Sequence, residues 1–398
     1  MTSERPRIVV VGAGIAGLAA AAALARAGLA CQVFEQAPEL SEVGAGIQLS
    51  PNGSRLLHRL GLGAALDRVA VRPQAIEVRR WDDDQVLTKT TLGAACAELY
   101  GAPYYTLHRA DLHQVLVDAL APGTVVLDRR CVGVTELADT VRLTFADGAT
   151  VDADLVIGAD GIRSAIRGHL LADQPRFSGQ AVFRGVVDAA ELPALVAEGK
   201  VLIWMGPGQH CVCYPISAGR LVSFAASTAA GDWRAESWSA GAATADLLTA
   251  YDGWNPVVRS VLGAPESVIR WALYDRPAVP RWSSARLMLI GDAAHPMLPF
   301  GAQGASQGIE DALALAACLA GASAATVPAA LRRYEAVRRP RTEQVHRFIQ
   351  DNERDHHVED GAEQRERDER MRADFGLRQR AWLFGYDAEA AATSPEAA

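Results

Sequence analysis

The sequence predicts an α/β protein: a Rossmann-like domain with an inserted mixed β-sheet domain and a C-terminal helical segment. A strand, a glycine turn and an alanine-rich helix follow one another in residues 7–28. Further strand-and-turn segments occur at 154–161 and 286–296. Residues 178–276 alternate strand-like and loop-like segments without a helical rhythm. The second domain is therefore expected as an insertion into the first.

The predicted domains are discontinuous in sequence. The boundaries are 1–70, 102–177 and 277–350 for the Rossmann-like domain, 71–101 and 178–276 for the inserted domain, and 351–398 for the C-terminal segment. Within the first domain, Asp147-Gly148 predicts a β-hairpin turn. The charged stretch 351–380 is expected to form a solvated helix face or a partly mobile segment.

Composition excludes several protein classes. A net charge of −8 argues against nucleic acid or an anionic membrane as the main partner. The apolar run at 15–25 is too short to span a membrane, and the N-terminus does not resemble a signal peptide. Six cysteines without a CxxC pair predict reduced thiols and a cytoplasmic protein. His356-His357 lacks a third ligand nearby in the sequence, so we expect a solvated pair and no metal site.

The first glycine turn has the spacing of a dinucleotide site. Gly12-x-Gly14-x-x-Gly17 follows a strand and opens a helix, whose N-terminal amides and dipole favour a phosphate. Glu35 ends the next strand, where a carboxylate can accept hydrogen bonds from ribose hydroxyls. This pattern alone does not separate NAD from FAD.

Four further motifs resemble those of one enzyme family. They are "GAGIQLSPN" (44–52), "HRADLHQVL" (108–116), "IGADGIRS" (157–164) and "IGDAAHPMLPFGAQGASQGIEDA" (290–312). In this order they resemble the single-component FAD-dependent aromatic hydroxylases, flavoprotein monooxygenases similar to para-hydroxybenzoate hydroxylase. The appearance is most similar to salicylate hydroxylase and 6-hydroxynicotinate 3-monooxygenase.

The resemblance implies non-covalently bound FAD and a set of cofactor contacts. Ser306 stands where the family often has asparagine, which puts one flavin contact in question. The implied contacts are Gly12, Gly14, Ile15, Ala16, Gly17, Glu35, Gln36, Gln48, Arg109, Asp160, Asp292, Pro299, Gly304, Ala305 and Ser306.

The string "HCVCYP" (210–215) predicts a strand with two proton-handling groups on one face. His210, Val212 and Tyr214 point one way, and Cys211 and Cys213 the other. In the family, the corresponding strand forms a wall over the flavin ring. The resemblance makes His210 the acid–base group and Tyr214 the group that orients the substrate; core packing is the alternative for both.

The remaining pocket walls follow from the same resemblance. Arg184 is a candidate partner for a substrate carboxylate, but an exposed strand charge is the favoured reading. The implied pocket comprises Gln48, His210, Val212, Tyr214, Met297, Pro299 and Phe300.

The implied reaction is hydroxylation of a small hydroxylated aromatic or heteroaromatic acid. NADH or NADPH reduces the flavin, and a flavin C4a-hydroperoxide transfers oxygen, with loss of CO₂ where a carboxylate occupies the attacked carbon. The sequence has no second GxGxxG unit, so the reductant is expected to bind transiently. A monomer or homodimer is expected. The alternatives are a hydroxylase of a larger aromatic natural-product intermediate, a flavin reductase, halogenase or ring-saturation catalyst, or a flavoprotein that sequesters an aromatic ligand without turnover.

Overall fold

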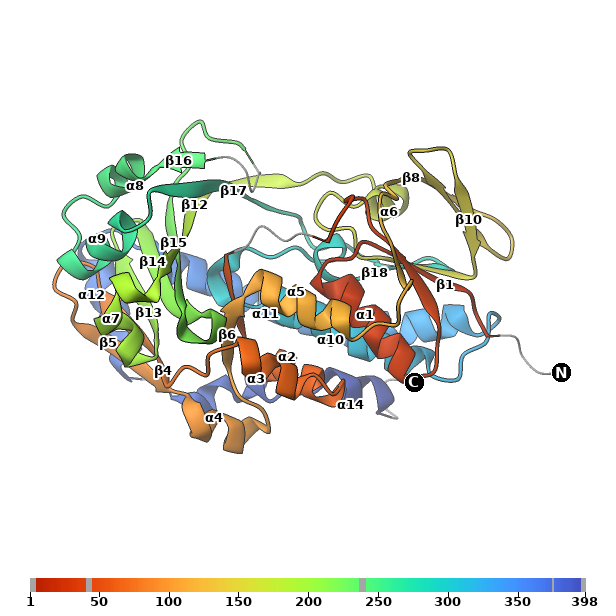
Figure 1. Ribbon diagram of the computed structural model, residues 1–398, viewed down its shortest axis with the longest axis horizontal. Coiled ribbons are helices and arrows are strands. Elements are labelled where there is room, and N and C mark those ends of the chain that lie inside the picture. Colours follow the sequence, from red (N-terminus) through yellow and green to blue (C-terminus); the bar gives the residue numbers. More distant parts are fainter. Residues whose placement is uncertain (1–4, 41–44, 236–240, 374–375, 395–398) are drawn as a thin grey trace.

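A five-stranded parallel sheet forms the centre of one half of the molecule (Figure 1). The computed structural model describes residues 5–40, 45–235, 241–373 and 376–394. In spatial order the strands are β18 (Leu287–Leu289), β11 (Leu155–Gly158), β1 (Ile8–Val11), β2 (Cys31–Phe34) and β7 (Val125–Val126). Strands β1 and β11 are buried throughout, as expected for a parallel sheet covered on both faces. The predicted Rossmann-like order of strand, helix and strand is confirmed.

Helices and small β-units surround this sheet. Helix α1 packs closely on α10 because both carry small residues where they meet. The helices are α1 (Ile15–Arg26), α2 (Pro51–Arg59), α3 (Gly63–Val69), α5 (Arg109–Asp118), α6 (Ala165–Leu170) and α10 (Gly304–Leu319). The small β-units are β3 (Gly46–Leu49) with β6 (Tyr105–His108), and β8 (Cys131–Glu136) with β9 (Val141–Phe145) and β10 (Thr150–Ala153). The predicted hairpin at Asp147-Gly148 joins β9 to β10, and Gly148 has φ +84°.

A mixed eight-stranded sheet forms the other half. Strand β13 pairs in parallel with β4, and the other neighbours are antiparallel. In order the strands are β16 (Gly241–Ala243), β17 (Ser267–Asp275), β12 (Arg176–Asp188), β15 (Leu221–Ala229), β14 (Gln209–Ile216), β13 (Val201–Gly206), β4 (Ala75–Arg80) and β5 (Val86–Thr91). Segments 75–91 and 176–275 thus meet in one sheet. Its outer face packs on α7 (Pro193–Glu198), α8 (Thr244–Ala250) and α9 (Pro256–Gly263).

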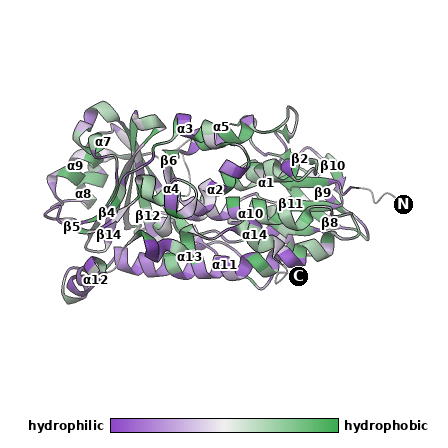
Figure 2. Ribbon diagram, turned by 90° about the horizontal axis from the view of Figure 1, so that it is seen from below, coloured by the Kyte–Doolittle hydropathy of each residue, from purple (hydrophilic) through white to green (hydrophobic). Residues whose placement is uncertain are grey.

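The C-terminal helices tie the two halves together. Helix α11 (Val327–His356) has 30 residues and runs along the length of the molecule, with a largely hydrophilic ribbon (Figure 2). Helix α11 continues through the predicted boundary at residue 350. It is followed by α12 (Ala362–Ala373), α13 (Ala381–Phe384) and α14 (Ala388–Thr393), and α4 (Gly93–Tyr100) shares a core with α11 and α13.

The tail after residue 350 is less solvated than its charge suggests. Arg367 and Asp368 on α12 are buried, and Arg367 donates a 2.6 Å hydrogen bond to the carbonyl oxygen of Asp355. Met371 packs against Leu87 and Met205 of the eight-stranded sheet. In the ranges that the structure describes, no helix combines the length and the apolar character needed to cross a membrane.

Candidate functional site

The glycine turn between β1 and α1 separates two packing glycines from one that faces open space. Gly12 has φ +103°, and a Cβ there would lie 2.4 Å from the carbonyl oxygen of Ala159. A Cβ on Gly17 would lie 2.0 Å from the carbonyl oxygen of Gly12. A Cβ on Gly14, the N-cap of α1, would meet nothing within 4 Å. The turn thus leaves room for a ligand at Gly14 alone.

The residues beside this turn bring the third motif against the first. The side chain of Ala16 would contact a Cβ placed on Gly291 at 2.8 Å and one on Gly308 at 3.0 Å. Ile15 is buried in the hydrophobic core. The helix N-terminus therefore lies directly beside the turn that follows β18.

Glu35 lies at the mouth of the glycine turn. Its carboxylate accepts hydrogen bonds from the backbone N–H groups of Ala13 at 2.7 Å and Ala37 at 2.9 Å. Gln36, the next residue, is exposed. The acid therefore holds the turn in shape and stays half-exposed beside it.

Asp160 closes the other side of the turn and caps α6. It accepts hydrogen bonds from the hydroxyl of Ser164 and from the backbone N–H of Ala165, the latter at 2.7 Å. Burial raises the pKa of this carboxyl above its usual value. Its Cα would be 3.0 Å from a Cβ on Gly12, so the second motif also packs on the first.

Arg109 and Asp292, from the second and fourth family motifs, lie close enough for their charges to interact. Burial lowers the pKa of half-buried Arg109, the charge of Asp292 opposes that shift, and the charge of Arg184 adds to it. Asp292 is an exposed residue in the short turn after β18. One carboxylate and two guanidinium groups from three segments thus share one region.

A buried ionic network fixes the turn that carries Asp292. Asp311 of α10 accepts hydrogen bonds from the backbone N–H of Gly291 at 2.8 Å and from Nε2 of His295 at 2.6 Å. Arg338 of α11 binds Asp311 at 2.7 Å and Glu310 at 2.5 Å. Although burial alone would raise it, the charges of His295 and Arg338 hold the pKa of Asp311 below its usual value.

The same network joins the segment 44–52 to the start of α10. Asn52 donates to Glu310 at 2.6 Å and to Gln303 at 3.1 Å. Ser306 is fully buried, and a Cβ on Gly53 would lie 2.8 Å from its Oγ. The small serine therefore lets α10 approach α2 closely. Gly304 is exposed and Ala305 half-buried at the open side of the first turn. Gly44 lies outside the described residues.

Tyr214 projects from β14 toward the segment at 45–49. A Cβ on Gly46 would lie 2.6 Å from the Tyr214 ring. Gln48 hydrogen-bonds to the Tyr214 hydroxyl, and it accepts a hydrogen bond from the hydroxyl of Tyr104 at 2.7 Å. Burial raises the pKa of Tyr214 to about 12, against the opposing influence of Arg184 and Gln48. Its hydroxyl is therefore protonated and fixed at neutral pH.

The favoured reading of Arg184 as an exposed strand charge is wrong. It is half-buried on the inner face of β12, where its charge acts on Tyr214 and Arg109. Burial lowers the pKa of its guanidinium, and Tyr214 opposes that shift. The sheet turns this side chain inward because its register partner on β15 is Ala225, which is paired in turn with Val212 of β14.

His210 lies on the same face as Tyr214 but beside α11. It is 7% exposed, and its Nδ1 lies 2.8 Å from Oγ of Ser227 and 3.1 Å from Nε2 of His357. The ring centroids of His210 and Phe300 are 5.5 Å apart in an edge-on arrangement. Cys211 and Cys213 point to the opposite face and are fully buried, as the alternation predicts. All six cysteines are free thiols.

The expectation that His356 and His357 form a solvated pair is wrong. His356 is buried, and the centroids of its ring and the His210 ring are 4.7 Å apart. The corresponding separation from His357 to His210 is 5.1 Å. The two residues that hydrogen-bond are 147 positions apart, so no sequence spacing signals the contact. Among the described residues, no group of three His, Cys, Asp or Glu side chains is arranged to hold a metal ion.

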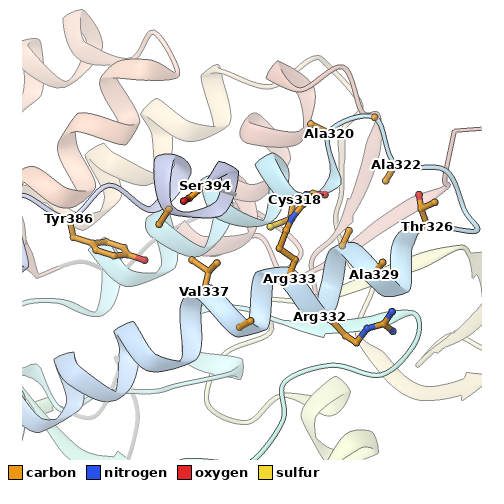
Figure 3. A pocket seen from close by; sticks show the side chains of 14 residues that line it. Cys318, Ala320, Ala322, Thr326, Ala329, Arg332, Arg333, Val337, Tyr386 and Ser394 are labelled. Carbon is orange, nitrogen blue, oxygen red and sulfur yellow. Dashed lines mark hydrogen bonds between the residues drawn. The ribbon is translucent and has the colours of Figure 1, made fainter. Parts of the chain in front are cut away.

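The other predicted pocket residues differ in exposure. Val212 is half-buried between His210 and Tyr214, Met297 is half-buried, and Pro299 is exposed. A separate hollow of about 900 Å³ lies between α10, α11 and α14 and contains none of the predicted site residues (Figure 3). Its lining includes Cys318, Arg333 and Tyr386.

These features fit a flavin dinucleotide. Open space at Gly14 beside a helix N-terminus suits a pyrophosphate. The half-exposed acid at Glu35 suits a ribose, and the guanidinium group of Arg109 lies close enough to Asp292 and Arg184 for their charges to interact.

Comparison with known proteins identifies the family. Residues 5–349 match the FAD binding domain family. The chain is 49% identical to 3-amino-4-hydroxybenzoate 2-monooxygenase of Streptomyces platensis over 98% of both chains. It is 37% identical to 6-hydroxynicotinate 3-monooxygenase of Bordetella bronchiseptica, over 87% of this chain and 91% of that relative. A salicylate hydroxylase substrate complex matches with a TM-score of 0.83 at 29% identity, covering 98% of this chain and 97% of the other. The chain therefore belongs to the FAD binding domain family and is an FAD-dependent aromatic monooxygenase.

Proposed function

We propose that this enzyme hydroxylates a small hydroxylated aromatic acid, with 3-amino-4-hydroxybenzoate as the first candidate. Support comes from the named activity of the relative with 49% identity. NADH or NADPH and O₂ are the proposed co-substrates. When bound, the flavin accepts electrons from the reductant and activates O₂. The cytoplasmic location and the monomeric or homodimeric state stay predictions.

The proposed cofactor site combines the glycine turn with the segments packed against it. The open side of Gly14 would receive the pyrophosphate and Glu35 a ribose. Asp292, Gly304 and Ala305 would lie toward the flavin end, where α10 begins. The wider set remains as predicted: Gly12, Ile15, Ala16, Gly17, Gln36, Gln48, Arg109, Asp160, Pro299 and Ser306.

One observation carries the proposed catalytic roles. The neutral imidazole of His210 and the protonated phenol of Tyr214 lie on the same face of β14. Burial and the neighbours His356 and His357 lower the pKa of His210 well below its usual value. His210 is therefore unprotonated near neutral pH and can accept a proton. Tyr214, held by Gln48, would orient the substrate, and Arg184 would bind its carboxylate.

The candidate substrate needs such a base. In 3-amino-4-hydroxybenzoate, carbon 2 is next to the carbon that bears the amino group, so the nitrogen lone pair enriches the attacked position in electrons. A proton must leave the ring system as the C–O bond forms. Accepting that proton at His210 lowers the barrier to oxygen transfer.

The test is coupled turnover by the purified holoenzyme. We expect 3-amino-4-hydroxybenzoate to stimulate NADH or NADPH oxidation and to gain one atom from ¹⁸O₂, detected by mass spectrometry. His210→Asn should slow oxygen transfer by about 10²–10⁴-fold with FAD content unchanged. The exposed His169→Asn serves as the matched control.

Three results would redirect the assignment. A decarboxylated product from 6-hydroxynicotinate or salicylate, with no product from 3-amino-4-hydroxybenzoate, would favour those substrate types. Binding of aromatic acids without product would favour sequestration. Unchanged coupling in His210→Asn would make the histidine a packing residue.

A further inference from the structure

His357, at the C-terminal end of α11, contacts the proposed base directly. Its Nε2 lies 3.1 Å from Nδ1 of His210 and 3.2 Å from Oγ of Ser227. Ser227 also accepts a 2.9 Å hydrogen bond from the backbone N–H of His210. The Ser227 hydroxyl and the rings of His210 and His357 thus all lie within hydrogen-bonding distance of one another.

The opposite nitrogen of His357 leads toward the surface. Its Nδ1 lies 3.4 Å from the amide nitrogen of Gln180, which donates to the carboxylate of Glu353 at 3.1 Å. Glu353 is half-buried, one helical turn before His357 on α11. The series His210, His357 and Glu353 therefore runs from the inner face of the sheet to a partly exposed carboxylate.

The contacts permit two hydrogen arrangements. In one, His210 donates from Nδ1 to Nε2 of His357, and His357 hydrogen-bonds to the backbone of Glu353. In the other, His357 donates from Nε2 to His210 and accepts at Nδ1 from Gln180. Going from the first to the second adds a proton to Nε2 of His210, moves the shared proton from Nδ1 of His210 to Nε2 of His357, and releases the proton on Nδ1 of His357. Within the described residues, no side chain hydrogen-bonds to Nε2 of His210, which leaves that nitrogen for the substrate.

We propose that His357 relays the proton that His210 takes from the substrate. The substrate N–H or O–H bond breaks as a bond forms to Nε2 of His210. The proton on Nδ1 of His210 passes to Nε2 of His357, and the proton on Nδ1 of His357 leaves toward Glu353 and solvent. His210 returns to a neutral ring without storing the charge. This inference rests on the proposed role of His210.

Burial suits a relay that passes its proton on. It lowers the pKa of His357 to about 4, so a positive charge on this ring does not persist near neutral pH. The surrounding charged groups are Glu353 on α11, with Arg176 of β12 and Asp275 of β17 close to it. The carboxylate of Glu353 lies at the outer end of the relay, where it can stabilise the proton that His357 releases toward solvent.

His356 provides the matched comparison. Its ring packs on His210, yet its Nδ1 is buried and has no hydrogen-bond partner in the described part of the chain. It is the neighbour of His357 at the end of α11 and also carries an imidazole, but its Nδ1 lacks the kind of hydrogen bond that joins His357 to His210. His356→Phe should therefore keep the hydrogen bond between His210 and His357, and because it also removes a neighbour that lowers the pKa of His210, it should act through the pH profile of turnover.

The experiment measures oxygen transfer in a single turnover. Reduced, substrate-bound holoenzyme is mixed with O₂ and the hydroxylated product is quantified. We expect His357→Ala to slow transfer about 10²-fold and to release peroxide in place of product. Added imidazole should restore at least a tenth of the wild-type rate. Pyrazole, a ring of the same size that is a far weaker base, should not. His357→Gln, which fills the site but cannot accept and then release a proton, should be as slow as His357→Ala. His356→Phe should still form product and should gain no rate from added imidazole.

The outcomes separate the relay from the function it serves. A wild-type rate in His357→Gln, or equal rescue by pyrazole and imidazole, would overturn the relay and leave the His210 base intact. If His210→Asn also turned over normally, the proposed catalytic role would fail first.

Discussion

The side chain of Tyr214 is fixed by groups from two other segments of the chain. Gln48 hydrogen-bonds to its hydroxyl, and Gly46 of the same strand packs against its ring. The positive charge of Arg184 on β12 lies close enough to act against the rise in its pKa. Its pKa of about 12 keeps the proton on oxygen at neutral pH. The side chain can therefore donate a fixed hydrogen bond to a substrate oxygen but cannot act as a base.

Tyr214→Phe tests this distinction. Because the hydroxyl would bind the ground and transition states alike, KM should rise about 3–10-fold, the equivalent of one hydrogen bond, while kcat changes less than twofold. Steady-state kinetics of coupled product formation measures both. A large loss of kcat with unchanged KM would instead place Tyr214 in the chemical step.

Single residues were predictable where their environment is local. The strand alternation correctly separates His210 and Tyr214 from Cys211 and Cys213. The predictions for Arg184 and for the His356-His357 pair are wrong because distant segments of the chain bury these side chains. A charged residue in a strand and two histidines in an acidic and basic tail look solvated until the sheet and α11 pack together.

At the scale of elements, the glycines of the β1–α1 unit differ in what surrounds them. Gly17 must let the helix approach the carbonyl oxygen of Gly12, whereas Gly14 borders open space. The sequence pattern predicts this unit because its spacing is local. The sequence pattern does not predict α11 as one element, because its buried Arg338 and Arg341 resemble surface residues until they pair with Glu310.

Gly14→Val and Gly17→Ala should therefore fail differently. Gly14→Val should fold but retain little FAD, because its side chain occupies the space proposed for the pyrophosphate. Gly17→Ala should lower the stability of the FAD-free protein by roughly 1–3 kcal/mol through overpacking. FAD absorbance per chain and thermal unfolding of both apoproteins measure the two effects. Equal Tm losses with full FAD content in Gly14→Val would contradict the cofactor assignment.

At the scale of the whole molecule, α11 couples the two sheets and buries histidines where it meets the second. Burial lowers the pKa of His356 to about 3, with His357 and Arg367 adding to the shift. The unfolded chain, with a histidine pKa near 6.5, binds the proton more readily than the folded one. Stability therefore rises with pH up to about 6.5 and is lost progressively as pH falls below it.

Replacing His356 should flatten this dependence. One such histidine costs about 2 kcal/mol of folding free energy at pH 5 relative to pH 8. His356→Phe should remove that part of the difference while keeping the aromatic packing. Chemical denaturation at the two pH values measures it for both proteins. An unchanged slope in the variant would mean that His356 is charged or exposed in the folded enzyme.

The length of α11 also bears on how modular this enzyme is. The family match ends at residue 349, inside the helix and before His356 and His357. A chain truncated there would retain the glycine turn and every strand of both sheets. It would lose the His356 and His357 rings that contact His210, and the carbonyl groups of Trp382 and Leu383 that accept hydrogen bonds from Arg341. A working truncation or chimaera of this enzyme would therefore need the terminal helices, which the alignment with the 49% identical relative includes, since it covers 98% of the chain.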